Sequence, residues 1–399
     1  MKIRILILSI IFAYSCADSK ETLVSWQEYP QLPPAHGATS QYGLASPFAG
    51  ISNGSVIVAG GSNFPDRPLA EGGAKCFHDD IFVLTEKNGA PEWLSGFRLD
   101  KPVAGGASVS LRDGLLCIGG SGYDGIYRDV FLLTWNEESL KVEKQVFPPL
   151  PFPMVNMGAA LLENVVYVAG GSTDDGASNK FLKLDLTKQQ TPEFRWEILP
   201  DFPGYGRQLP VMVAQYAAGE PSVFLFSGLV FPETSDDPVI HTNGLKYNPK
   251  EKTWQTLSDI QTEPAGKTHV LYAGSGVKFG KNSIVCMGGA NYDILLDALK
   301  RERVAQIANQ SGNTDAYRKH LEWKQFYLTQ PLEWYRLNTD ILTYHTQTGQ
   351  WKEIGELPFP AVVCAAAVEW KNGWLLISGE VKPGVRTPKV YYGELRIEN

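Results

Sequence analysis

The chain alternates short apolar segments with glycine-rich turns, and one arrangement of these segments recurs six times. In each repeat an apolar strand ends at a glycine pair or at Ser-Gly, and a loop and two further strands follow. Glycine at this point lets the backbone bend outward where strands crowd near an axis. The pattern therefore predicts an all-β protein, a six-bladed β-propeller. The apolar strands with their glycines are residues 56–61, 115–120, 165–171, 223–228, 284–289 and 374–379.

Successive glycine pairs are about 50 to 60 residues apart, except between the fifth and the sixth. This period is typical of Kelch-like repeats, whose fourth strand often carries a tryptophan that packs between blades. The sixth repeat reaches Asn399 without a fourth strand, whereas residues 24–33 contain Trp26 and resemble the other fourth strands. We expect residues 24–33 to pair with the sixth blade and close the ring, which leaves no unpaired sheet edge there. Residues 16–399 then form a single propeller domain.

The long interval in the fifth repeat, about 290–339, predicts an insertion between its second and third strands. Apolar residues in 293–307 approximate helical spacing, and residues 315–326 form a second candidate helix. A helical insertion in blade five is expected to cover the mouth of the ring. It is either a lid or pocket wall, or else a surface excursion or dimer contact.

The first residues have the composition of an export signal. Lys2 and Arg4 precede an almost wholly apolar stretch, residues 3–14, which is too short to span a membrane. We interpret residues 1–15 as a signal peptide, with cleavage before Cys16. Ordinary cleavage gives a free secreted protein, and a lipobox gives a lipoprotein anchored through Cys16. The expected location is the periplasm, with membrane attachment only through that anchor.

The net charge and the cysteines limit which partners and bound groups are expected. The formal net charge is −7 and no run of Lys or Arg occurs, so a nucleic-acid partner is not expected. Cys117, Cys286 and Cys364 lie in apolar segments and are predicted to be small buried residues on strands. Cys76 lies in a loop near His78, but no further ligands have metal-site spacing. We expect neither a metal nor a cofactor.

The candidate catalytic residues lie in the loops between second and third strands. In a propeller these loops are on the same face as the connections between blades. The sixth of these loops, residues 378–387, carries Glu380, Lys382 and Arg386 around a Pro-Gly turn. An acid and two bases in one short loop at the axis indicate either a reactive site or an ion pair that braces the turn.

Four further residues on this face are candidate substrate contacts. Arg207 and Gln208 begin blade four, and Arg207 is either a substrate contact or a brace between blades. Asn63 and Asn291 come shortly after glycine pairs and point toward the axis in the predicted fold. Asparagine is also a common turn residue, so a purely local role is the alternative for both.

The segment Gly-Glu-Val-Lys-Pro-Gly-Val-Arg-Thr at 379–387 closely resembles the signature of the bacterial N-acetylneuraminate epimerases, which are Kelch-type sialic acid mutarotases. Residues 48–53, residues 59–61 and the insertion after Gly289 are also similar to this family. The resemblance covers nearly all of the mature chain but in a different order, which implies a cyclically permuted branch. A ring whose ends meet can be opened at another blade junction.

The resemblance implies an isomerase that interconverts the α and β anomers of N-acetylneuraminate. It assigns the catalytic pair to Glu380 and Arg386. Lys382 either adds positive potential beside this pair or is a solvated lysine of the turn. A carboxylate can transfer the protons, and arginine matches the substrate carboxylate. The main alternative is a non-catalytic carbohydrate- or protein-binding Kelch propeller. Sialoside hydrolysis is disfavoured, because the sequence contains no Ser-x-Asp-x-Gly-x-x-Trp box.

Overall fold

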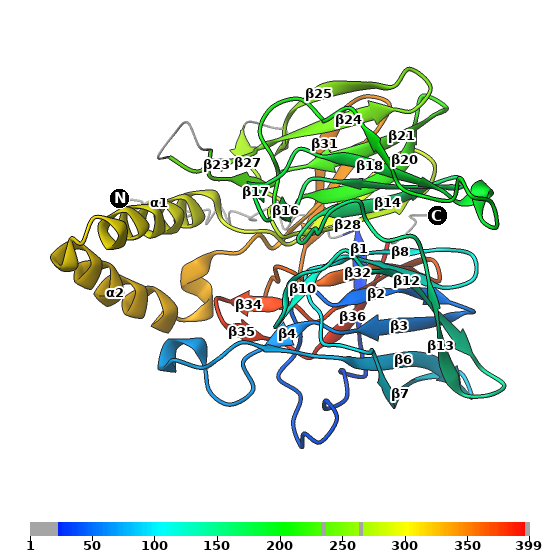
Figure 1. The fold of residues 1–399 in the computed structure, drawn as a ribbon, viewed down its shortest axis with the longest axis horizontal. Helices are drawn as coiled ribbons and strands as arrows, with labels where there is room; N and C mark the ends of the chain where they lie inside the picture. Colours follow the sequence, from blue (N-terminus) through cyan, green and yellow to red (C-terminus); the bar gives the residue numbers. More distant parts are fainter. Residues whose placement is uncertain (1–22, 233–236, 263–265, 396–399) are drawn as a thin grey trace, which may run out of the picture.

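Six sheets of four or more strands form the blades of the ring in the computed structural model, which describes residues 23–232, 237–262 and 266–395. Figure 1 views the ring from the side. The predicted six-bladed propeller is confirmed. The proposed signal peptide and Cys16 lie outside the described residues. Within them, no helix has both the length and the apolar character needed to cross a membrane.

Each blade contains four antiparallel strands in chain order, with the loop between the second and third strands forming a separate element, and the sixth blade takes its outer strand from the N-terminus. From the inside outward, blade one is β2 (Phe48–Ser52), β3 (Ser55–Ala59), β6 (Asp80–Lys87) and β7 (Ala90–Arg98). Blade two is β8 (Ala107–Ser110), β9 (Leu115–Ile118), β12 (Val130–Asn136) and β13 (Lys141–Val146). Blade three is β14 (Gly158–Leu162), β15 (Val165–Ala169), β18 (Phe181–Asp185) and β19 (Glu197–Leu199).

The other three blades follow the same order. Blade four is β20 (Val211–Ala217), β21 (Glu220–Phe226), β24 (Asn243–Asn248) and β25 (Thr253–Asp259). Blade five is β28 (Ser275–Phe279), β29 (Ser283–Met287), β30 (Asp340–His345) and β31 (Gln350–Glu356), extended at its outer edge by β26 (Gln261–Thr262) and β27 (Lys267–Thr268). Blade six is β32 (Ala366–Trp370), β33 (Gly373–Ile377), β36 (Val390–Leu395) and β1 (Val24–Tyr29).

Strand β1 is the outer strand of blade six, and all six of its residues pair antiparallel with β36. Trp26 packs edge-on against Trp374 of β33 and Phe359. The two ends of the described chain are thereby joined in one sheet, and blade one is held beside blade six.

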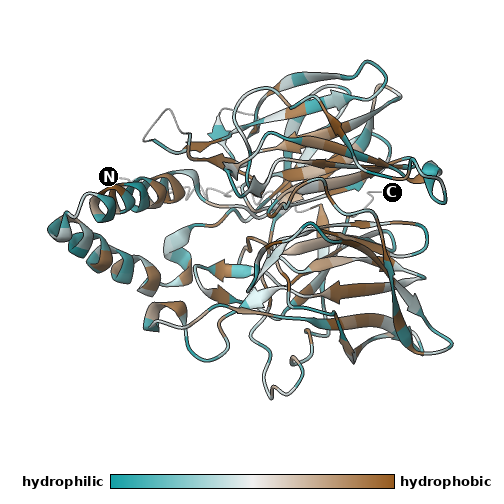
Figure 2. Ribbon diagram, viewed as in Figure 1, coloured by the Kyte–Doolittle hydropathy of each residue, from teal (hydrophilic) through white to brown (hydrophobic). Residues whose placement is uncertain are grey.

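The hydrophobic core lies between blades. Successive side chains of a strand point to opposite faces of its sheet, so each blade contributes apolar residues to both neighbours. A separate buried cluster fills every junction, including that between blades six and one, whose cluster contains Leu84 and Leu375. Figure 2 shows the hydrophobic colour concentrated along the strands.

Each blade contributes one residue, from the turn before its innermost strand, to a ring of backbone hydrogen bonds around the axis, here called the axial ring. Each N–H donates to the carbonyl of the preceding blade's equivalent residue at 2.6–3.0 Å, and the sixth bond closes the circle. All six residues have φ between 48° and 72°, the left-handed conformation. The members of the axial ring are Ser46, Gly105, Asn156, Leu209, Ala273 and Cys364.

The prediction that Cys364 lies on a strand is wrong. Its left-handed backbone belongs to the turn before β32, and its side chain is partly exposed because the axial ring borders the open mouth. Cys117 and Cys286 are buried in β9 and β29, as expected for small apolar residues.

Two helices occupy the loop between β29 and β30. Helix α1 (Tyr292–Gln310) and helix α2 (Thr314–Thr329) form a helical hairpin, and the short helix η3 (Leu332–Tyr335) leads to β30. They project from one face of the ring (Figure 1). Asn291 and Asn313 cap the two long helices by accepting the backbone N–H of Ile294 and Ala316.

Candidate active site

Five of the six loops between second and third strands form two-stranded hairpins, and these occupy equivalent positions around the axis. They are β4 (Ser62–Asn63) with β5 (Cys76–Phe77), β10 (Ser121–Gly122) with β11 (Gly125–Ile126), β16 (Ser172–Thr173) with β17 (Gly176–Ala177), β22 (Leu229–Val230) with β23 (Val239–Ile240), and β34 (Glu380–Lys382) with β35 (Val385–Arg386). In blade five the insertion takes the place of the hairpin.

The first residue pair of each hairpin shows what is particular to blade six. In the other four described hairpins this pair is Ser62–Phe77, Ser121–Ile126, Ser172–Ala177 and Leu229–Ile240. In β34–β35 the same register places Glu380 opposite Arg386. The fold thus presents a charged pair at a position where its equivalents are neutral.

Glu380 and Arg386 form an ion pair at the mouth of the ring. Arg386 Nη2 lies 2.6 Å from Glu380 Oε2, and the two side chains are only 8% and 20% exposed. Burial raises the pKa of Glu380, although Arg386, the Gly384 N–H and Lys75 act in the opposite direction. A carboxyl group with a raised pKa exchanges protons more readily near neutral pH.

The guanidinium of Arg386 is incompletely paired. It stacks on the ring of Phe64 at 4.7 Å, and Nη2 faces Glu380. Its Nε and Nη1 atoms are buried and have no hydrogen-bond partner among the described residues. Buried donors without acceptors cost about 1–3 kcal/mol each. An anionic ligand that supplied acceptors here would recover that free energy.

A cavity of about 120 Å³ adjoins Glu380. Blades five and six and the insertion build its walls, which are mainly apolar and aromatic. Its lining includes Tyr272, Ala290, Asn291, Ile294, Leu295, Tyr327, Tyr335, Leu337, Val363, Lys382 and Pro383. The Lys382 Nζ donates to the carbonyl of Gln330 at 2.7 Å, which ties the hairpin to the end of α2. The insertion therefore forms a wall of this cavity.

Blade one contributes a second cation from across the ring closure. Lys75 lies over the ring of Phe77 at 4.6 Å and at the exposed rim. Its partly enclosed position and the charge of Arg386 lower the pKa of Lys75. The mouth carries more positive than negative charge, because three basic side chains, Lys75, Lys382 and Arg386, surround one carboxylate, Glu380. It therefore attracts anions.

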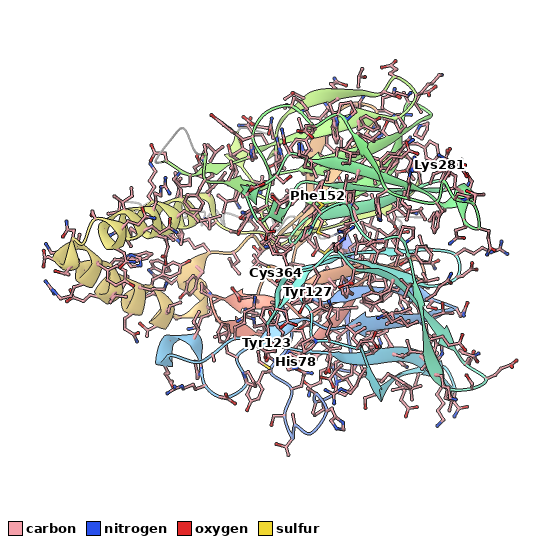
Figure 3. The ribbon with its side chains drawn as sticks, viewed as in Figure 1. His78, Tyr123, Tyr127, Phe152, Lys281 and Cys364 are labelled. Atoms are coloured by element: carbon pink, nitrogen blue, oxygen red, sulfur yellow. The ribbon has the colours of Figure 1, made fainter. Side chains whose placement is uncertain are left out.

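Cys364 of the axial ring lies close enough to this charged pair to interact with it electrostatically, and it is labelled near the middle of the molecule in Figure 3. Burial and the neighbouring Glu380 raise the pKa of its thiol to about 11. The thiol therefore stays protonated at neutral pH.

Comparison with known proteins agrees with the motif. A family model described as N-acetylneuraminate epimerase matches residues 14–142 and 147–399. The chain belongs to this family. The resemblance seen in the sequence is thereby confirmed, whereas the permuted order of its segments stays a prediction.

Curated members of the N-acetylneuraminate epimerase family share moderate identity with the chain. The protein of that name from Haemophilus influenzae (strain PittEE) is 30% identical over 250 residues, which cover 63% of this chain and 60% of the relative. The Salmonella typhimurium (strain LT2) protein is 30% identical over 246 residues, 61% and 57% of the two chains. The alignments thus span about 60% of the relatives' length.

The solved "Structure of YjhT" superposes with a TM-score of 0.57 at 16% identity, covering 90% of this chain and 94% of the other. At this identity the likeness shows the fold, and it agrees with the six-bladed arrangement described above.

Among the other site residues proposed from sequence, Lys382 and Asn291 line the cavity beside Glu380. Asn291 also caps α1. Asn63 is 3% exposed, donates to the Gly43 carbonyl and lies 2.8 Å from His78 Nε2. It therefore supports the blade-one hairpin next to Phe64, and its side chain is already engaged.

Arg207 and Gln208 lie outside the lining of this cavity. Arg207 is 2% exposed, and its guanidinium donates to the Ser227 and Asn243 carbonyls and to Asn243 Oδ1. These bonds brace the approach to blade four, which is the alternative interpretation of this arginine. Gln208 pairs through its backbone with Leu229 of the blade-four hairpin.

The described residues contain one group of three carboxylates that approach one another closely, Asp340, Glu353 and Glu356. It lies on the outer strands of blade five, away from the cavity lining, and Lys267 and the buried His269 approach Asp340. Nothing in this arrangement points to an ion at the site of Glu380.

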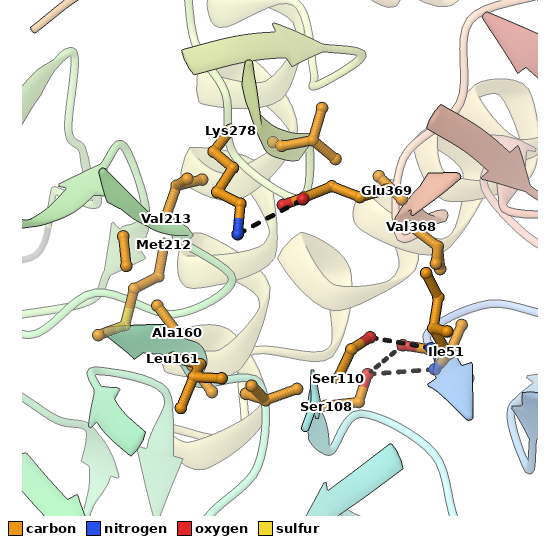
Figure 4. A pocket seen from close by; sticks show the side chains of 17 residues that line it. Ile51, Ser108, Ser110, Ala160, Leu161, Met212, Val213, Lys278, Val368 and Glu369 are labelled. Carbon is orange, nitrogen blue, oxygen red and sulfur yellow. Dashed lines mark hydrogen bonds and ion pairs between the residues drawn. The ribbon is translucent and has the colours of Figure 1, made fainter. Parts of the chain in front are cut away.

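The opposite end of the axis holds a second cavity, of about 220 Å³, lined by all six innermost strands (Figure 4). Its polar groups are already paired. Lys278 lies 3.5 Å from Glu369, and Ser108 and Ser110 hydrogen-bond to the backbone of β2. The unpaired donors of Arg386 distinguish the hairpin face as the candidate active site.

Residues missed by sequence reasoning are Phe64, Lys75, Tyr272, Tyr327 and Tyr335. No local motif marks them, because they reach the site from blade one, from the blade-four connection and from the insertion. Because they are far from Glu380 along the chain, the sequence around Glu380 does not predict them.

Proposed function

We propose that this protein is a sialic acid mutarotase that interconverts the α and β anomers of N-acetylneuraminate. The observation that carries the proposal is the buried Glu380–Arg386 pair, presented by the one described hairpin with charges at this register. Membership of the N-acetylneuraminate epimerase family and the positively charged mouth support it. Anomer exchange requires only proton transfers around ring opening, so the proposal involves no cofactor.

Glu380 is proposed to exchange protons with the sugar. It accepts the proton of the anomeric hydroxyl as the bond between the anomeric carbon and the ring oxygen breaks, while the ring oxygen keeps the electron pair of that bond and is protonated to the hydroxyl of the open form. The open keto form rotates about its C2–C3 bond and closes on the other face, and Glu380 returns the proton. Because burial raises its pKa, the carboxylate is basic enough to take this proton and acidic enough to give it back.

Arg386 is proposed to bind the carboxylate that the substrate carries on its anomeric carbon. Its two unpaired donors supply hydrogen bonds to an anion, and its ion pair with Glu380 fixes the distance between that anion and the reacting carboxyl. Lys75 and Lys382 add positive potential at the entrance, which favours encounter with acidic sugars.

Proton NMR of N-acetylneuraminate, freshly released as the α anomer, tests the proposal. The wild type is expected to accelerate conversion to the β anomer well above the buffer rate, whereas Glu380→Gln is not. Arg386→Ala should mainly weaken substrate capture. If the wild type binds the sugar without accelerating conversion, the protein is a carbohydrate-binding propeller and the proposal is wrong.

We also propose that the protein is exported and held at a membrane by a lipid on Cys16. Support comes from the basic and apolar residues 2–14 that precede this cysteine. Labelling of the full chain with a fatty-acid analogue in a bacterial host should mark the wild type and not Cys16→Ser. A periplasmic but unlabelled wild type would contradict the anchor, and retention in the cytoplasm would contradict export.

A further inference from the structure

The residue that precedes each member of the axial ring faces the hairpin side of the propeller. In five blades it forms a backbone bridge to the adjacent hairpin, and in blade six Val363 bridges to Glu380 itself. Blade five places Tyr272 at this point, and it is the one aromatic residue among the six equivalents. The full set is Ala45, Ala104, Val155, Gln208, Tyr272 and Val363.

Tyr272 extends from this position into the cavity beside Glu380. Its ring packs against a buried cluster formed by Leu229, Ile240 and Val270, and leucines of α1 cover the same cluster. Among the described residues, no group hydrogen-bonds to its hydroxyl. Tyr272 is only partly buried, so its hydroxyl, which has no partner among the described residues, is accessible to a ligand group in the cavity.

The surroundings of Tyr272 keep its proton in place. Burial raises the pKa of its hydroxyl above the usual range, and the neighbouring Cys364 and Glu380 add to the effect. Glu380 and Tyr272 therefore present an acceptor and a donor to the same cavity. The raised pKa makes Tyr272 a weaker acid than an ordinary tyrosine, so its hydroxyl can give its proton only to a strongly basic oxygen, such as the ring oxygen as its carbon–oxygen bond breaks.

We propose that Tyr272 is the acid that protonates the ring oxygen of the sugar while Glu380 removes the anomeric proton. The inference rests on the mutarotase function proposed above. The electron pair of the broken carbon–oxygen bond goes to the ring oxygen, which takes the Tyr272 proton. The electrons of the anomeric O–H bond form the carbonyl, and that proton goes to Glu380. Closure on the other face reverses both transfers, so both residues regain their starting state.

Two other tyrosines line the cavity and are less suited to this role. The Tyr335 hydroxyl donates to the backbone carbonyl of Tyr327. Tyr327 belongs to the projecting helix α2 and stacks on Trp323 with ring centres 5.1 Å apart. Tyr272 instead adjoins Ala273, whose N–H and carbonyl are both bound within the axial ring. A reacting group is positioned best by such a rigid support.

The experiment compares Tyr272→Phe with Tyr327→Phe and Tyr216→Phe in the NMR assay. Tyr272→Phe keeps the ring and removes the hydroxyl, so kcat should fall by about 100-fold, a typical effect for a general acid. KM should change by less than about threefold, since the substrate carboxylate is held elsewhere. Tyr216, which is 42% exposed on β20, is the matched control and should behave as wild type.

Thermal unfolding separates chemistry from folding, because the Tyr272 hydroxyl makes no hydrogen bond whose loss would destabilise the protein. An unchanged kcat in Tyr272→Phe, with an active wild type, would overturn the inference. So would a large loss confined to Tyr327→Phe, or a rise in KM with kcat intact, which is the signature of a positioning role. An inactive wild type would instead contradict the mutarotase function itself.

Discussion

Trp26→Ala tests how the ring is closed. The indole of Trp26 meets Phe359 at 5.1 Å and Trp374 at 5.9 Å, both edge to face. Each such pair contributes about 0.5–1.5 kcal/mol beyond area burial, and loss of a buried tryptophan side chain costs about 3–5 kcal/mol. Because Trp26 is only partly buried, we expect the free energy of unfolding to fall by about 3 kcal/mol.

Urea unfolding followed by tryptophan fluorescence and circular dichroism measures this loss. Gln27→Ala is the matched control, since Gln27 lies exposed on the same strand and pairs with Tyr392. The β34–β35 hairpin leads directly into β36, so loosening of β1 should also lower mutarotase activity in Trp26→Ala. If the two variants unfold at the same urea concentration, β1 is not the element that secures the ring.

Three further results are expected. Activity should rise with pH through the pKa of Glu380, and because burial raises that pKa the half-maximal point of kcat/KM should lie above pH 4.5; a midpoint below 4.5 would contradict the burial argument. Lys75→Gln should raise KM several-fold at low salt and much less at high salt, as screening removes the attraction, and a salt-independent change would refute it. Gly60→Ala should cost about 2 kcal/mol more than Gly54→Ala in urea unfolding. Both glycines have positive φ, but a Cβ at Gly60 would lie 2.3 Å from the Val103 carbonyl oxygen, while nothing lies within 4 Å at Gly54.

Much of the architecture is readable from local spacing. The glycine pairs predict where second strands end, and Gly60 and Gly61 do adopt the positive φ values that such a bend requires. The charged loop at 379–387 is equally local, because Glu380 and Arg386 are only six residues apart. Both features depend on neighbours in the chain, so periodicity and turn chemistry suffice to find them.

The cysteine at 364 shows where that reasoning fails. An apolar neighbourhood predicts a strand residue, yet Cys364 belongs to the axial ring, where its conformation is imposed by hydrogen bonds to Ser46 and Ala273. Those partners lie in other blades. When distant segments determine the backbone conformation of a residue, the sequence around that residue does not predict the conformation.

By itself the sequence determined the six repeats, the helical insertion and the acidic and basic residues of one loop. The tertiary structure alone decided which residues surround that loop. Closure of the ring brings Lys75 and Phe64 of blade one to Arg386, and the insertion with Tyr272 encloses Glu380. The physical reason is burial: the raised pKa of Glu380 and the unpaired donors of Arg386 arise from walls that different blades supply. No pattern of neighbouring residues encodes such an enclosure.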